Sequence, residues 1–387
     1  FMDKDGRREW LVSDPEISCN QPVPLAPRPQ PHLRPGTVDY RETTGTYYVQ
    51  DVYAGPGLEG VARGSIEWLR VVALEYRAAG IGENRSDGPA GAALASTPVS
   101  VGNGAWDVKV VLGDAKVHAD GSALFSVPAR TPVYFQAIDT RGYAAQTMRS
   151  WSTLQPGERF SCVGCHEPKN TSPMARTKPT LAMQAGVQAL RPFYGPPRGF
   201  SFPAEIQPIL DRHCVRCHDD RNRRMGQGAA RNDPERAFSL LDIPHHDPFA
   251  KRYWNEAYLN LTRARPFIRN GKPHAYQAQI NEWVEWPGAQ SVPSMLPPYS
   301  AGAATSRLMK LLEGGHYGVA LSREERDKLA CWIDLFVPYC GDYKEAHAWS
   351  ERERAKYAHF AAKRARMEAV ERENIAAYLA EKAVTAS

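Results

Sequence analysis

The chain has 387 residues, of which 42% are hydrophobic and 24% are charged, and its formal net charge is +5. These values match ordinary globular proteins and exclude a disordered chain. No apolar run reaches the roughly 18 residues of a transmembrane helix, and the basic residues are mixed with acidic ones, so neither a membrane span nor nucleic-acid binding is predicted.

The first 43 residues predict an extended, proline-rich N-terminal strap. Asp3-Lys4-Asp5-Gly6 followed by residues 9–12 is typical of a tight turn that enters a strand. Residues 19–36 contain six prolines and show no hydrophobic period, which favours extended structure without a core of its own.

Residues 44–200 predict a β-rich domain. Several segments in this stretch alternate with period two or are rich in β-branched and aromatic residues. They are 46–49, 66–72, 108–111, 123–127 and 133–137. Turn signals such as Asp120-Gly121 separate the strands, which predicts an antiparallel β-sandwich-like domain or a partial barrel. The Gly/Ala/Pro-rich stretch 79–105 is expected to be a surface loop.

Residues 201–345 predict a mostly α-helical, cytochrome c-like domain, so the fold class is α+β. Residues 203–210 form a short helical pattern. Ser322 and Glu325 have the spacing of a capping box that opens a second helix. That helix is expected to bury Leu329, Trp332, Ile333 and Phe336.

Residues 346–387 predict one long, charged C-terminal helix. Ser350 and Glu353 form another capping-box pattern, and nearly every later residue is a good helix former. A modest apolar stripe leaves two interpretations open. The helix lies along the body of its own chain, or it docks on another subunit.

Two C-x-x-C-H motifs carry the chemistry, at Cys162–His166 and Cys214–His218. In such a motif both cysteines form thioethers to one porphyrin, and the next residue, histidine, binds the iron. The sequence therefore predicts two haem c groups, attached at Cys162, Cys165, Cys214 and Cys217, with His166 and His218 as iron ligands.

Zinc and thiol redox chemistry are the alternatives to haem. A zinc ribbon places its C-x-x-C pairs about 15–20 residues apart and needs no histidine after each pair. Here residues 166–213 separate the two pairs. A thioredoxin-like motif would require a βαβ context, which the sequence does not show.

The remaining cysteines are Cys19, Cys331 and Cys340. Haem is attached on the oxidising side of the bacterial membrane, which predicts a periplasmic or extracellular protein in which Cys331 and Cys340 could form a disulfide. Cys19 is expected to be a buried thiol, and the alternatives are a ligand to an additional structural metal or no functional role. The chain opens without the apolar region of a signal peptide, so we expect an exported protein that has been processed or truncated.

The sixth iron ligand decides whether a haem transfers electrons or binds substrate. For the second haem the candidates are His213, His245, His246, His274 and His316. His316 is favoured, because it lies in a Gly-flanked loop between two apolar helical segments. His245 or His246, or an ordinary surface role for His316, are the alternatives.

For the first haem Met148 is a candidate metal ligand through its thioether, and core packing is the alternative for this residue. Trp151 and Phe160 are expected to line the porphyrin. Arg149 or Arg159 could pair with a propionate.

Several segments resemble the hydrazine synthase alpha-subunit family. The resemblance covers most of residues 8–345, and the segment from Asp14 to Cys19 is similar to the one that follows this family's β-propeller, which is absent here. The segments that carry it are Asp120–Ala129, Tyr134–Gln136, Gln146–Trp151, Pro156–Glu158, Cys162–Glu167, Ile206–Leu210 and Leu329–Leu335.

The resemblance implies a β-rich middle domain with one haem and a helical C-terminal domain with a bis-histidine haem, whose distal histidine matches His316. In the synthases a tyrosine four residues after the first motif histidine binds the iron, and the histidine turns towards zinc. This chain has Asn170 there. Asparagine is a poor iron ligand, so the departure argues against hydrazine synthesis and favours His166 on the iron.

The leading interpretation is a di-haem cytochrome that exchanges electrons with redox partner proteins. It could act within a larger assembly, or as a homo-oligomer or polymer joined through the C-terminal helix and the N-terminal strap. The alternative is a haem enzyme related to hydrazine synthase, whose five-coordinate first haem acts on small nitrogen compounds or peroxide.

Overall fold

The computed structural model describes residues 2–16, 19, 25–27, 36–76, 101–102, 104–166, 178–221, 239–288 and 295–385. The chain divides into two compact units, Phe1–Gly36 and Thr37–Ser387. In the first unit the predicted turn is present, because the Gly6 N–H donates to the Asp3 carbonyl at 3.1 Å. Met2 and Arg8 form a bridge around it, but residues 9–12 form no strand.

A five-stranded sheet organises the second unit. Its order is β6-β5-β2-β3-β8, and all neighbours are antiparallel. The strands are β2 (Ile66–Leu74), β3 (Lys109–Lys116), β5 (Val133–Asp139), β6 (Ala144–Thr147) and β8 (Arg198–Gly199). In β2, Leu69 and Val71 face one core, and Val72 and Leu74 face the other. The sheet is therefore buried on both faces here, which explains why the second half of β2, Val71–Leu74, is continuously apolar.

A smaller sheet packs on one face of the larger one, with the strand order β4-β1-β7. It contains β1 (Thr44–Val49), β4 (Ala123–Pro128) and β7 (Arg159–Cys162). Tyr47 and Phe125 from this sheet share a core with residues of β2 and β5. The two sheets thus pack as a sandwich, although β1 and β7 pair in parallel rather than antiparallel.

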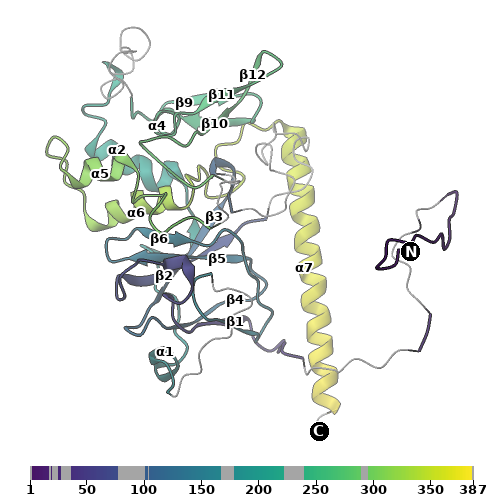
Figure 1. Ribbon diagram of the computed structural model, residues 1–387. Coiled ribbons are helices and arrows are strands. Elements are labelled where there is room, and N and C mark those ends of the chain that lie inside the picture. Colours follow the sequence, from purple (N-terminus) through teal and green to yellow (C-terminus); the bar gives the residue numbers. More distant parts are fainter. Residues whose placement is uncertain are drawn as a thin grey trace. The chain divides into compact units, whose positions relative to one another are not determined.

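Helices cover the other face of the five-stranded sheet (Figure 1). They are η3 (Phe202–Ile206), α2 (Gln207–His213), α4 (Glu256–Leu261), α5 (Arg307–Glu313) and α6 (Arg323–Asp334). Three further short elements are η1 (Pro56–Leu58), η2 (Gly104–Trp106) and α1 (Leu181–Ala185). Leu329, Trp332, Ile333 and Phe336 are all buried, as the pattern predicted. The α+β class with antiparallel sheets is confirmed.

The region expected to be mostly helical also contains two β-hairpins. They pair β9 (Pro244–Asp247) with β10 (Arg252–Asn255), and β11 (Arg265–Arg269) with β12 (Lys272–Gln277). These strands contain histidine, arginine and proline and have no clear apolar period, so the sequence pattern did not indicate them. Most of the predicted loop 79–105 lies outside the described residues.

The long C-terminal helix is present as α7 (Glu351–Thr385). It contacts the rest of its unit at several points along its length. Glu353 pairs with Lys251, Glu371 pairs with Arg130 at 3.3 Å, and the Tyr378 ring packs edge-on against Tyr40. Among the described residues, no helix combines the length and apolar character needed to span a membrane.

The predicted capping box of α6 forms and gives a testable prediction. The Ser322 hydroxyl accepts from the Glu325 N–H at 3.2 Å, and the Glu325 carboxylate accepts from the Ser322 N–H at 2.8 Å. Because α6 lies in the core, we expect Ser322→Ala to lower the free energy of unfolding by about 1 kcal/mol in urea denaturation. Ser350→Ala removes the corresponding N-cap of α7, which is mostly exposed, so it should lower the free energy of unfolding by less than Ser322→Ala does. Equal losses of unfolding free energy in the two variants would contradict this prediction.

Candidate haem sites

The first motif begins where β7 ends. Cys162 lies opposite Val49 in the parallel β1–β7 pair. The following turn packs against the loop after β1, because the Gly57 N–H donates to the Cys165 carbonyl at 3.2 Å. A Cβ at Gly164 would lie 2.1 Å from the Ala54 carbonyl oxygen. Glycine at this position therefore lets the motif approach the loop closely.

A cavity of about 440 Å³ opens beside this motif. Its lining includes Cys162, Cys165 and His166 together with aromatic and aliphatic side chains. The latter are Tyr47, Val49, Val52, Leu69, Phe135, Ala137, Met148, Phe160, Met295 and Leu296. A mostly apolar cavity of this size, with two thiols and an imidazole on its wall, suits a large apolar plate such as a porphyrin. The residues present therefore fit a haem.

Some of the residues expected around the first haem line the cavity, and others do not. Met148, Arg149 and Phe160 line the cavity. Trp151 and Arg159 are exposed and are not among the lining residues. Met148 also packs against the helical core, which is consistent with the packing alternative. Asn170 lies outside the described residues.

Two lining residues were missed from the sequence. Tyr47 is almost completely buried, burial raises the pKa of its hydroxyl, and that hydroxyl donates to Ser152 Oγ at 2.7 Å. Met295 brings a second thioether to the cavity. No sequence motif marks either residue, because Tyr47 has the pattern of an ordinary strand residue and Met295 lies in a proline-rich segment.

The second motif follows directly after α2. The Cys214 N–H continues the helix by donating to the Leu210 carbonyl, and the His218 N–H turns back to the Cys214 carbonyl at 2.9 Å. Burial raises the pKa of the Cys214 thiol to about 11, whereas Cys217 is exposed. The His218 carbonyl accepts from the Leu240 N–H at 3.0 Å, which ties the motif to the following segment.

His316 faces His218. Their ring centroids are 6.2 Å apart and their planes differ by 19°. Each metal–imidazole bond is about 2 Å long and each ring centroid lies about 1.1 Å beyond the nitrogen, so two imidazoles on opposite sides of one metal have centroids roughly 6 Å apart. The observed separation leaves room for one metal ion between the rings.

The other histidine candidates have different partners. His213 Nε2 lies 3.0 Å from a Glu325 carboxylate oxygen, and His245 Nε2 lies 2.8 Å from one of Glu256. His246 packs against Tyr253, and His274 packs against Phe249. Of the five candidates, His316 is the one whose ring lies near that of His218, with the two planes nearly parallel.

The remaining cysteines differ from the expectations. Cys19 is exposed, so its interpretation as a buried thiol is wrong. Cys331 and Cys340 are both buried thiols and no disulfide joins them; burial raises the pKa of each to about 12. Within the described part of the chain, no three His, Cys, Asp or Glu side chains gather into a metal site, so nothing there supports the additional structural metal.

Comparison with known proteins supports the family resemblance that the sequence motifs carry. Residues 64–167 match the family model for the hydrazine synthase alpha subunit middle domain. The resemblance predicted from the sequence is thereby confirmed, since this part of the chain is similar to the middle domain of the hydrazine synthase alpha subunit.

One similar curated protein is hydrazine synthase subunit alpha of Kuenenia stuttgartiensis, which is 24% identical over 332 residues. The match covers 72% of this chain but only 39% of the relative's length. Among solved structures, Kuenenia stuttgartiensis hydrazine synthase is similar with a TM-score of 0.49 and 18% identity, over 80% of this chain and 45% of that chain.

Proposed function

We propose that this chain is a di-haem c-type cytochrome that mediates electron transfer. The observation that carries the proposal is the nearly parallel pair of imidazole rings from His218 and His316, 6.2 Å apart. An iron with imidazole on both faces has no open position for a substrate, so it is suited to electron transfer.

The chain's own residues would hold and shield the two groups. Iron porphyrin, when bound, supplies reversible one-electron oxidation and reduction. At the first site the thiols of Cys162 and Cys165 would attach it, His166 would bind the iron, and Met148 is the proposed second ligand. The rings of Phe135 and Phe160 line the same cavity and would exclude water from it.

At the second site the thiols of Cys214 and Cys217 would attach the porphyrin, and His218 and His316 would bind its iron. Haem attachment of this kind supports a periplasmic or extracellular location. We further propose redox partner proteins and a larger or polymeric assembly. The exposed side of α7, on which Met367 is 64% exposed, is available for such contacts.

An enzyme is the second candidate. The similarity to a hydrazine synthase subunit and the cavity of about 440 Å³ beside His166 favour it. In that case the first haem would be five-coordinate and the cavity would also admit a small nitrogen compound or peroxide. Asn170 in place of the family's tyrosine weighs against hydrazine synthesis itself.

Haem counting combined with electron paramagnetic resonance tests these proposals. We expect the reduced pyridine adduct to give two covalent haems per chain, both low-spin and unchanged by cyanide. The double variants Cys162→Ser with Cys165→Ser, and Cys214→Ser with Cys217→Ser, should each lose one haem. A high-spin, cyanide-binding haem that disappears in the first double variant would favour the enzyme, and a colourless mature protein would end both proposals.

A further inference from the structure

The loop that carries His316 is weakly packed. It follows α5, in which Met309 is the only buried residue. Within residues 313–318 His316 is half-buried, and the other five residues are exposed. Three of those five are glycines, and Gly315 and Gly318 have positive φ angles of 85° and 76°. Because glycine leaves the backbone conformationally free, the loop alone does not hold the imidazole in place.

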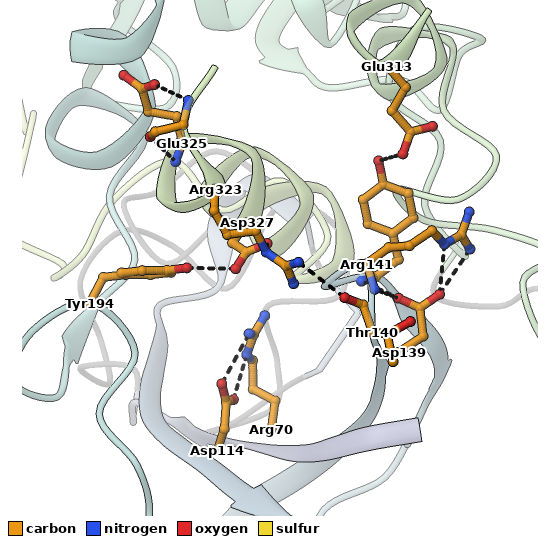
Figure 2. Close-up of polar contacts among 12 residues, drawn as sticks. Arg70, Asp114, Asp139, Thr140, Arg141, Tyr194, Glu313, Arg323, Glu325 and Asp327 are labelled. Carbon is orange, nitrogen blue, oxygen red and sulfur yellow. Dashed lines mark hydrogen bonds and ion pairs between the residues drawn. The ribbon is translucent and has the colours of Figure 1, made fainter. Parts of the chain in front are cut away.

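A tyrosine from the five-stranded sheet reaches this loop. The Tyr143 hydroxyl donates to Glu313 Oε1 at 2.5 Å, and Figure 2 shows the Glu313 carboxylate with this hydrogen bond. Glu313 is the last residue of α5, and two glycines separate it from His316. Among the described residues, no other hydrogen bond joins residues 313–318 to a part of the chain outside α5 and the loop itself. The end of α5 therefore depends on Tyr143 for this connection.

Tyr143 is itself held firmly. It lies directly before β6, after the turn that follows β5, and is 4% exposed. Its backbone N–H donates to Asp139 Oδ1 at 3.0 Å, and the Arg141 guanidinium carbon lies 4.8 Å from the centre of its ring. Burial and the Glu313 carboxylate raise the pKa of Tyr143, so its hydroxyl stays protonated and donates. Tyr143 therefore offers Glu313 a donor in a fixed position.

We propose that the hydrogen bond between Tyr143 and Glu313 is a positioning contact that keeps His316 on the iron of the second haem. This role rests on the proposed function, because it takes His316 as the distal ligand. With Glu313 fixed, the free segment before the imidazole is two glycines long. Without the contact, the weakly buried last turn of α5 from Lys310 onwards is free as well. A shorter free segment raises the effective concentration of a ligand at its metal.

The contact also connects the second site to the β-rich part of the chain. The strands on either side of Tyr143 contribute Ala137, Gln146 and Thr147 to the cavity beside the first motif. The loop that carries His316 is thus fixed to the same hairpin that lines the first haem site. We therefore expect ligation at the second site to depend on a residue far from its own motif.

Carbon monoxide titration of the reduced full chain tests the proposal, because carbon monoxide competes with His316 for the second iron. Tyr143→Phe should lower the concentration that half-saturates this haem at least about threefold. Glu313→Ala should do the same, and it alters an exposed residue, so it remains informative if Tyr143→Phe does not fold. The two substitutions combined should add nothing further, since each removes the same contact. Glu313→Gln keeps an oxygen that accepts from Tyr143, so its half-saturation should stay close to that of the unaltered chain.

Tyr194→Phe is the matched control. The Tyr194 hydroxyl also donates to a helix carboxylate, that of Asp327 at 2.7 Å, but on α6, which carries no proposed haem ligand (Figure 2). This variant should lower the free energy of unfolding and leave carbon monoxide binding unchanged. The same half-saturation in Tyr143→Phe and the unaltered chain would overturn the proposal, as would an equal change in Tyr194→Phe.

His316→Ala separates this result from a failure of the proposed function. It removes the competing ligand, so the second haem should bind carbon monoxide more tightly in this variant than in any other. If His316→Ala has this effect and Tyr143→Phe has none, the positioning role alone is wrong. If His316→Ala leaves carbon monoxide binding unchanged, the distal assignment is wrong and the positioning role fails with it.

Discussion

His316→Ala is expected to convert one of the two proposed haems from low-spin to high-spin. In the structure the His316 ring lies 6.2 Å from that of His218, which is the separation expected for two ligands of one metal. In the proposed site, removal of the imidazole would open one face of the iron and leave His218 in place. We therefore expect one low-spin signal to disappear from the electron paramagnetic resonance spectrum, and the variant to bind cyanide or carbon monoxide.

Two further variants make this test specific. His316→Met supplies a thioether instead, so it should restore a low-spin haem and raise its reduction potential. His245→Ala removes a histidine that pairs with Glu256, so it should leave both signals unchanged. If His316→Ala kept an unaltered low-spin spectrum, the assignment of the distal ligand would be wrong.

Local patterns predicted much of the fold. The strands β2 to β5 and the helices α6 and α7 follow from apolar periodicity and from the capping residues Ser322 and Ser350. The two hairpins within residues 244–277 could not be predicted from such local patterns. Their stability comes from side chains such as Trp254, which is buried against Tyr258 and Trp106, and such long-range packing leaves no period in the strand itself.

The site residues also differ in whether a local sequence pattern could indicate them. His316 was predicted from a local signal, a glycine-flanked histidine between two apolar segments. Its ring lies 6.2 Å from that of His218, and its role as an iron ligand stays a prediction. Met295 and the contact between Tyr143 and Glu313 could not be found, because each depends on which strands and loops become neighbours. Tyr143 and Glu313 are 170 positions apart in the sequence, so no local pattern could join them.

Asp334 is expected to make the stability of the protein depend strongly on pH. Its side chain is buried at the end of α6 and accepts from the Ala144 N–H at 2.9 Å and the Ala303 N–H at 2.8 Å. Asp334→Ala leaves both N–H groups without this acceptor. At about 1–3 kcal/mol for each buried unsatisfied group, we expect a loss of about 3 kcal/mol in urea denaturation.

The pH dependence has a defined sign. Burial raises the pKa of Asp334 from 3.8 to about 7, against the two backbone hydrogen bonds, which lower it. Between pH 4 and pH 7 the folded chain therefore holds a proton that the unfolded chain has lost, so the free energy of unfolding falls as pH rises through this window. A shift of about three units corresponds to at most about 4 kcal/mol.

Asp334→Asn cannot titrate, so its stability relative to the unaltered chain should improve steadily from pH 4 to pH 7. The measurement is urea denaturation of both proteins across this range, with the difference plotted against pH so that the other groups cancel. Asp39→Asn serves as the control, because hydrogen bonds from Arg41 lower the pKa of Asp39 to about 2, below the window. A difference between Asp334→Asn and the unaltered chain that stays constant with pH would show that the Asp334 carboxyl titrates normally, and that its burial is compensated by the hydrogen bonds from Ala144 and Ala303.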